Sequence, residues 1–217
     1  MIPALRHALG RLALLATLAG GVTIGGCSGA NDALLSPHGF LGAELPTTVP
    51  KPDFTFTDSR GQPYSLAQAT AGKVTLLFFG YTHCPDVCPV HLANLAAVLA
   101  AMPDSIQSQV VVVFITTDPA RDTPAVLDSW VKGFDPHFVG LTGSDSVIAA
   151  AQRTAQVLLA VKDTTDSKGN YGVGHAAQVI AYTRDGIGRV EYPPGTRQRD
   201  WAHDLPLLVA YGNTPGS

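Results

Sequence analysis

The sequence is poor in charge, and above all in positive charge. Charged residues make up 14% of the 217 residues, and 14 lysines and arginines stand against 17 aspartates and glutamates. A nucleic-acid-binding domain needs a clustered basic surface, so the net charge of -3 argues against a nucleic-acid partner. Hydrophobic residues reach 46%, which excludes a chain that is disordered throughout.

Cysteine is also scarce, and long apolar runs are missing. Three cysteines are too few for a small scaffold held together by disulfides, so the fold must depend on a hydrophobic core. The apolar run at residues 12–24 is well short of the roughly 20 residues that span a bilayer as a helix. No other stretch approaches that length, which argues against a transmembrane helix.

The N-terminal segment has the pattern of a secretory signal peptide. Two arginines precede the apolar run, and small residues follow it. The end of the run, Ile24-Gly25-Gly26-Cys27, resembles a bacterial lipobox, in which the chain is cut before a cysteine that then receives lipid. We therefore expect a signal peptide at residues 1–26 and a lipid anchor on Cys27, which would hold the protein on the extracytoplasmic face of a bacterial cell membrane. The alternatives are an ordinary signal cleavage near Gly26 and an uncleaved short anchor.

Residues 27–50 are expected to form the lipidated tether, because they mix Gly, Ser, Thr and Pro without periodicity. A single folded domain is expected at residues 51–217. Continuous apolar runs at 74–79 and 110–116 predict buried strands. From Pro89 onward, apolar residues recur at helical spacing and predict a helix.

The remaining patterns extend this alternation to the end of the chain. A turn signal at 58–61 predicts an N-terminal hairpin over residues 54–66. Further helices are expected at 124–132, 144–156 and 201–211, and further strands at 138–141, 177–182 and 188–192. Strands that alternate with helices indicate an α/β fold with a largely parallel central sheet, covered on both faces and ending in an antiparallel hairpin.

With Cys27 assigned to lipid, Cys84 and Cys88 remain. They lie between the first central strand and the helix that follows it, and ligands in α/β proteins gather at the carboxyl ends of strands. Cys88 precedes Pro89 and is expected at the cap of the helix, where free N–H groups and the helix dipole favour a thiolate. Cys84, four residues earlier, is close enough for a disulfide or a shared metal ion.

Three roles are open for this pair. A structural disulfide would close a very small loop and contribute little stability. A redox pair fits the thioredoxin-type position at the start of a helix. A soft-metal site fits too, because two thiolates prefer Cu(I) or zinc, and structural zinc would require four ligands. A peroxidase is disfavoured, because it would need one dominant cysteine in a pocket of its own.

Two blocks of the sequence resemble the signature of the Sco/SenC copper-delivery proteins. The first is FFGYTHCPDVCP at residues 78–89, and the second is TDPARDTP at 117–124, followed by further matches at 131–136 and 140–143. The resemblance covers about residues 50–212. It implies a thioredoxin-like fold with a mixed sheet, and copper, as Cu(I) or Cu(II), bound by both cysteines and one distant histidine. It also implies a role in building the dinuclear copper centre of cytochrome c oxidase, with its copper-bearing subunit as partner.

Among the seven histidines, His175 matches the family's ligand in order and in context, at the entry to a buried strand. His91, inside the first helix, is the next candidate. The family usually has an acid before the ligand and a hydroxyl residue after it, whereas this chain has Gly174 and Ala176. The contact that orients the ring must therefore come from elsewhere, or copper binds more weakly.

Three charged residues are expected to support the ligands. Asp86 lies in the cysteine loop, and Asp118 and Arg121 follow the second central strand; the alternative for all three is a purely local turn or ion pair.

The sequence leaves two functions open. One is a copper metallochaperone, and the other is a thiol–disulfide oxidoreductase that keeps the cysteines of the oxidase reduced.

Overall fold

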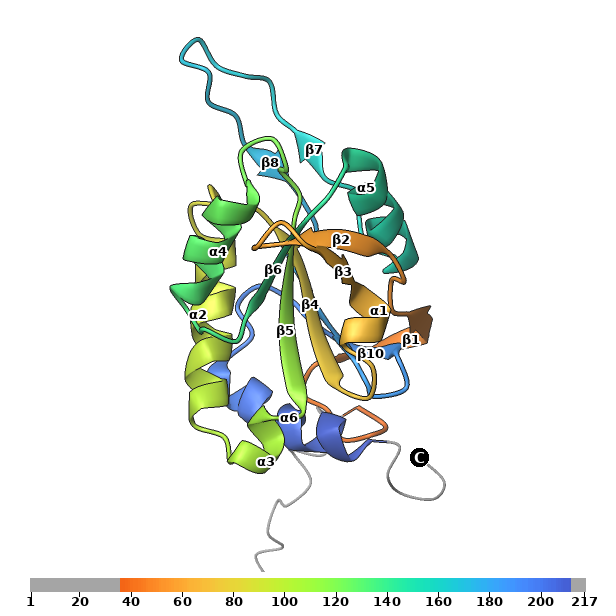
Figure 1. Ribbon diagram of the computed structural model, residues 1–217. Coiled ribbons are helices and arrows are strands. Elements are labelled where there is room, and N and C mark those ends of the chain that lie inside the picture. Colours follow the sequence, from red (N-terminus) through yellow and green to blue (C-terminus); the bar gives the residue numbers. More distant parts are fainter. Residues whose placement is uncertain (1–35, 212–217) are drawn as a thin grey trace, which may run out of the picture. The chain divides into compact units, whose positions relative to one another are not determined.

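The computed structural model describes residues 36–211, which form an eight-stranded sheet covered by helices (Figure 1). The strand order is β1-β10-β9-β4-β5-β6-β2-β3. The expected signal peptide and Cys27 lie outside the described residues. Within the described part of the chain, no helix is long and apolar enough to span a membrane.

The elements of the sheet and its covering layers have the following bounds. The strands of the sheet are β1 (Ala43–Pro50), β2 (Thr55–Asp58), β3 (Pro63–Ser65), β4 (Val74–Gly80), β5 (Val110–Thr116), β6 (Val139–Thr142), β9 (Val179–Tyr182) and β10 (Ile187–Tyr192). A separate small hairpin is formed by β7 (Val161–Lys162) and β8 (Val173–Gly174). The helices are α1 (Leu66–Ala69), α2 (Val87–Ala100), α3 (Asp104–Gln107), α4 (Pro124–Lys132), α5 (Asp145–Thr154) and α6 (Gln198–Ala210).

The α/β fold with a central mixed sheet is confirmed, but the expectation of largely parallel pairing was wrong. β4 pairs parallel with β5, and β5 pairs parallel with β6. β9 lies antiparallel beside β4, and the outer strands are antiparallel as well. The alternation of strands and helices does not fix strand direction. The connection from α5 to β9 carries the β7–β8 hairpin instead of a crossover helix, and it brings the chain back antiparallel.

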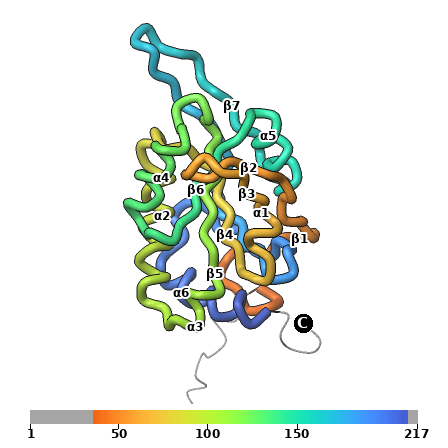
Figure 2. The backbone as a smooth tube through the Cα atoms, viewed as in Figure 1, coloured from red at the N-terminus to blue at the C-terminus, as the bar shows by residue number. Residues whose placement is uncertain are grey.

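The central strand β4 divides the core into two layers. All of its residues are buried, and successive side chains point to opposite faces. Leu76 and Phe78 pack with apolar side chains of α2, α4 and α6. Leu77 and Phe79 pack with those of α1 and α5. The path of the chain in Figure 2 shows the helices on both sides of the strands, so the expected two-sided cover is confirmed.

Residues 43–50 form an edge strand, contrary to the expectation of an unstructured tether. β1 pairs with β10 from Ala43 to Pro50, with an irregularity between Glu44 and Val49. Prolines within this segment concealed the strand, because an edge strand tolerates prolines that a central strand excludes. Before β1, Phe40 is only 1% exposed and belongs to the core layer that includes α6.

A buried carboxylate on α6 holds the segment that precedes β1. Asp204 is fully buried and accepts hydrogen bonds from the backbone N–H groups of Leu41 and Gly42, each at 2.9 Å. The ring of His38 lies 5.6 Å from the ring of Tyr211. The first and last described residues therefore meet beside α6. In Figure 1, α6 lies at the opposite end of the sheet from the β7–β8 hairpin.

Candidate metal centre

The cysteines lie on the loop that joins β4 to α2. Cys84 is on the loop and partly exposed, whereas Cys88 is the second residue of α2 and fully buried. Asp86 occupies the N-cap position, so the expectation that Cys88 caps the helix was wrong by two residues. Pro89 is tolerated at this point because the N–H groups of the first helical turn have no partner inside the helix.

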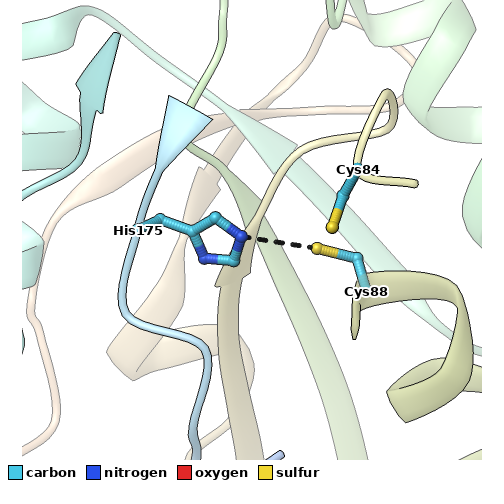
Figure 3. A group of neighbouring side chains, drawn as sticks. All are labelled: Cys84, Cys88 and His175. Atoms are coloured by element: carbon cyan, nitrogen blue, oxygen red, sulfur yellow. Dashed lines mark hydrogen bonds between the residues drawn. The ribbon is translucent and has the colours of Figure 1, made fainter. Parts of the chain in front are cut away.

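His175 reaches the same place from the chain segment between β8 and β9. It follows β8, and its Nε2 lies 3.7 Å from the Sγ of Cys88 (Figure 3). One ligand atom from each of Cys84, Cys88 and His175 lies within 4.8 Å of the other two. Among residues 36–211, this is the only group of three or more potential metal-binding side chains. The structure thus brings together the three residues expected from the sequence.

The orientation of the His175 ring is set by the backbone and by two aromatic walls. Nδ1 lies 2.9 Å from the carbonyl oxygen of Ala176. In the tautomer that donates from Nδ1 to this oxygen, the lone pair of Nε2 points toward the sulfur atoms. The rings of Tyr81 and Phe78 lie edge-on to the imidazole, at 5.6 and 6.3 Å between centroids. The carbonyl of Ala176 therefore orients this ring, which is the role of the neighbouring acid in the family pattern.

Comparison with known proteins identifies the family. The family model described as SCO1/SenC matches residues 43–210. The chain belongs to the SCO1/SenC family. The matched range includes β1 and thus begins before residue 51.

Individual relatives agree with this assignment. The mitochondrial protein SCO2 homolog of Mus musculus is 38% identical over 138 residues, which are 62% of this chain and 52% of that protein. The chain thus spans about half the length of this curated relative. The solution structure of apo Sco1 from Thermus thermophilus has a TM-score of 0.70 and 35% identity, and covers 80% of this chain and 99% of that one. The thioredoxin-like fold is confirmed by these neighbours.

A copper-bound relative is also similar. The structure of Bradyrhizobium japonicum ScoI with copper bound has a TM-score of 0.63 and 35% identity. The similarity covers 76% of this chain and 97% of the relative. The donor set of this Sco-family chain suits such an ion, because thiolate and imidazole are soft or intermediate ligands.

Burial controls the protonation of Cys88 in this Sco domain. The pKa of its thiol is raised well above the usual value, chiefly because the side chain is desolvated, and the neighbouring Cys84 adds to the shift. In the metal-free protein, burial of the sulfur therefore opposes the thiolate that was expected at the start of the helix. Binding of a metal ion at Cys88 must release its proton.

Gly80, at the end of β4, makes room for the Cys88 sulfur. A Cβ atom at this position would lie 2.7 Å from the Sγ of Cys88 and 2.7 Å from the ring of Phe114. Gly80→Ala should therefore displace the sulfur and lower the unfolding free energy by about 1–3 kcal/mol, the usual cost of overpacking. Thermal unfolding and Cu(I) affinity measure the two effects.

Gly143→Ala is the matched control for this prediction. The added methyl group would make only ordinary contacts, the nearest at 3.5 Å from Phe56. Its unfolding temperature and its copper affinity should both stay close to those of the parent protein. Equal behaviour of the two alanine variants would show that Gly80 is not needed to accommodate the sulfur.

The three supporting residues expected from the sequence do not contact the ligands directly. Asp86 is exposed, and its side chain makes no capping hydrogen bond. Asp118 is fully buried and pairs with the Nε of Arg121. Both contact Tyr171, on the chain segment that leads into β8. Of the expected roles, a local turn position describes Asp86, while Asp118 and Arg121 contact the segment that carries the histidine.

Asp122 follows the second central strand together with Asp118 and Arg121 and shares their expected supporting role, but its contact with Thr82, beside the cysteines, was not predicted. Asp122 is fully buried and accepts hydrogen bonds from the backbone N–H and the hydroxyl of Thr82, at 2.9 and 2.6 Å. It also accepts from the hydroxyl of Thr116 at 2.6 Å. Thr82 lies in the first family block and Asp122 in the second, and this was the available signal. The positions of the two blocks in the sequence do not show that these residues are in contact.

The other described histidines lie outside the ligand group. His91 is only 3% exposed; its ring hydrogen-bonds to the backbone of Ala177 and packs edge-on against Phe78. His83 is mostly exposed, with Nδ1 3.1 Å from the Thr82 hydroxyl. The rest pair with nearby carboxylates: His38 with Glu44, His137 with Asp135, and His203 with Asp204.

Proposed function

We propose that this Sco-family protein binds one copper ion through Cys84, Cys88 and His175 and delivers it to the dinuclear copper centre of cytochrome c oxidase. The observation that carries the proposal is the convergence of two sulfur atoms and one imidazole nitrogen within 4.8 Å. Two thiolates and one imidazole suit low-coordinate Cu(I), whereas structural zinc normally takes four ligands. The copper-bound Bradyrhizobium relative supports the choice of metal.

The unequal exposure of the two cysteines supports a role in transfer. Cys88 is fully buried, and Cys84 is partly exposed on the loop. A ligand of an acceptor protein therefore approaches the copper ion from the Cys84 side, while Cys88 and His175 remain bound to the ion. A copper ion with three protein ligands can accept one more ligand. An acceptor ligand therefore binds before a protein ligand leaves.

We also propose the location suggested by the sequence. Residues 1–26 would be removed as a signal peptide, and lipid on Cys27 would hold the domain on the extracytoplasmic face of a bacterial membrane. The small residues that directly precede Cys27 support this assignment. A lipid anchor would confine the donor and its membrane-bound acceptor to one surface.

His175→Ala tests the proposal. Loss of a ligand should weaken Cu(I) binding by at least about 10–100-fold, the range that follows even from loss of an outer-shell partner. Competition against a Cu(I) chelator under anaerobic conditions measures the change. His83→Ala is the control, because this histidine adjoins Cys84 in sequence but lies outside the ligand group; it should bind copper like the parent.

The alternative function is reduction of the oxidase cysteines, which two unpaired neighbouring thiols also permit. Thiol–disulfide exchange needs Cys84 and Cys88 but not the imidazole as a metal ligand, so His175→Ala should leave its rate unchanged. Unaltered copper affinity in His175→Ala, together with rapid disulfide exchange, would contradict copper delivery through this site and favour the oxidoreductase.

A further inference from the structure

The segment that carries His175 follows a short hairpin, and the buried side chains of Val173 and Ala176 hold it on either side of the histidine. β7 and β8 pair at Val161–Gly174 and Lys162–Val173, and the backbone N–H of Asp163 donates to the carbonyl oxygen of Gly172 at 3.0 Å. Gly174, directly before the histidine, is exposed and has no side chain with which to anchor the chain. The hairpin projects from the body of the domain in Figure 1. The placement of the imidazole therefore depends on contacts made where the hairpin joins the domain.

Tyr171 makes those contacts, four residues before His175. Its hydroxyl donates to Oδ1 of the fully buried Asp118 at 2.8 Å. The guanidinium of Arg121 lies 3.7 Å from the centre of its ring and donates to its carbonyl oxygen at 3.1 Å. A stacked cation and two hydrogen bonds thus hold one residue to the loop after β5.

That loop is itself fixed to the central sheet. The backbone N–H of Asp118 donates to the Thr116 hydroxyl at 2.9 Å, and the backbone N–H of Asp122 donates to the Asp118 carbonyl at 3.0 Å. Asp122 in turn binds Thr82, two residues before Cys84. The loop after β5 therefore holds the cysteine segment through the buried carboxylate of Asp122 and the histidine segment through that of Asp118.

We propose that Tyr171 is a positioning residue for copper binding: by its hydrogen bond to Asp118 it fixes the segment that carries His175 against the cysteine loop. The inference rests on the proposed function. Without this contact the cysteines keep their places, while the histidine segment samples positions in which Nε2 is too far from the sulfur atoms. Loss of this hydrogen bond should therefore weaken copper binding only through His175.

Tyr171→Phe tests this, because it removes only the hydroxyl and keeps the ring under Arg121. Cu(I) affinity should fall about 10-fold, as is usual when a group that orients a ligand is lost. In a His175→Ala background the same substitution should change affinity by less than about twofold, because the interaction through which it acts is gone. An equal loss in both backgrounds would mean general destabilisation and would overturn the proposal.

Tyr192→Phe is the matched control. Its hydroxyl also donates to a fully buried carboxylate, Oδ2 of Asp204 at 2.9 Å, but on α6 and away from the ligands. This variant should lose stability and keep its copper affinity. In the metal-free protein, amide hydrogen exchange at residues 171–176 should be faster in Tyr171→Phe and unchanged in Tyr192→Phe.

The outcomes separate this inference from the proposed function. Parent-like copper affinity and parent-like exchange in Tyr171→Phe, with weakened binding in His175→Ala, would overturn the positioning role and leave copper delivery intact. Parent-like affinity in His175→Ala would contradict the proposed ligand set itself, and the positioning role would fail with it.

Discussion

Replacing both Cys84 and Cys88 by serine should abolish copper binding. Serine keeps the size of the side chain but offers a hydroxyl that stays protonated at neutral pH and binds Cu(I) poorly, and a single imidazole remains. We expect the affinity to fall by more than about 1,000-fold, since two of three soft ligands are lost. Metal analysis after anaerobic loading and gel filtration should find one copper per chain in the parent and none in the variant.

The folded state of this double variant needs a separate check. Cys88 is fully buried, and a serine hydroxyl without a partner there costs about 1–3 kcal/mol. Circular dichroism and thermal unfolding should therefore show a folded but less stable protein. A folded double variant that still retains one copper per chain would place the metal elsewhere and contradict the site.

A chain that begins at Lys51 should be much less stable than one that begins at Ser36. The shorter chain lacks β1 and both backbone donors to the buried Asp204. Hydrogen bonds to a charged group contribute about 1.5–3 kcal/mol each, so the unfolding free energy should fall by at least about 3 kcal/mol. For a domain of this size the unfolding temperature should fall by at least about 6 °C.

Denaturant unfolding of the two chains measures the difference directly. A variant of the longer chain, Asp204→Ala, is the control that separates the carboxylate contacts from the strand: it keeps β1 but loses the acceptor. Its stability should lie below that of the parent as well. Equal unfolding midpoints for the chains that begin at Ser36 and Lys51 would contradict a structural role for residues 36–50.

The elements that were found from the sequence are those with strong local patterns. β5 was predicted with its observed bounds because a run of apolar, mostly β-branched residues is typical of a buried strand. α4 was predicted from Thr123 to Gly133, and the structure shows Thr123 accepting a hydrogen bond from the backbone of Val126. β1 was missed because its stability comes from pairing with β10, over 130 positions later in the chain, which no local pattern records.

Some features of the candidate site were predictable from the sequence, and others were not. Two closely spaced cysteines after a buried strand indicated a redox or soft-metal site, and the family resemblance supplied His175. The raised pKa of Cys88 was not predictable, because it depends on how completely the tertiary fold buries the sulfur. The orientation of His175 was not predictable either, because its partner is a backbone carbonyl, and any residue at position 176 would provide one.

The meeting of His38 and Tyr211 beside α6 has a practical consequence. A fluorophore, a purification tag or a sensor chip attached at either end of the described chain would sit at the pole remote from the sulfur and imidazole donors. Molecules fixed in this way would all present those donors outward, so the rate at which a soluble acceptor collects copper could be read directly.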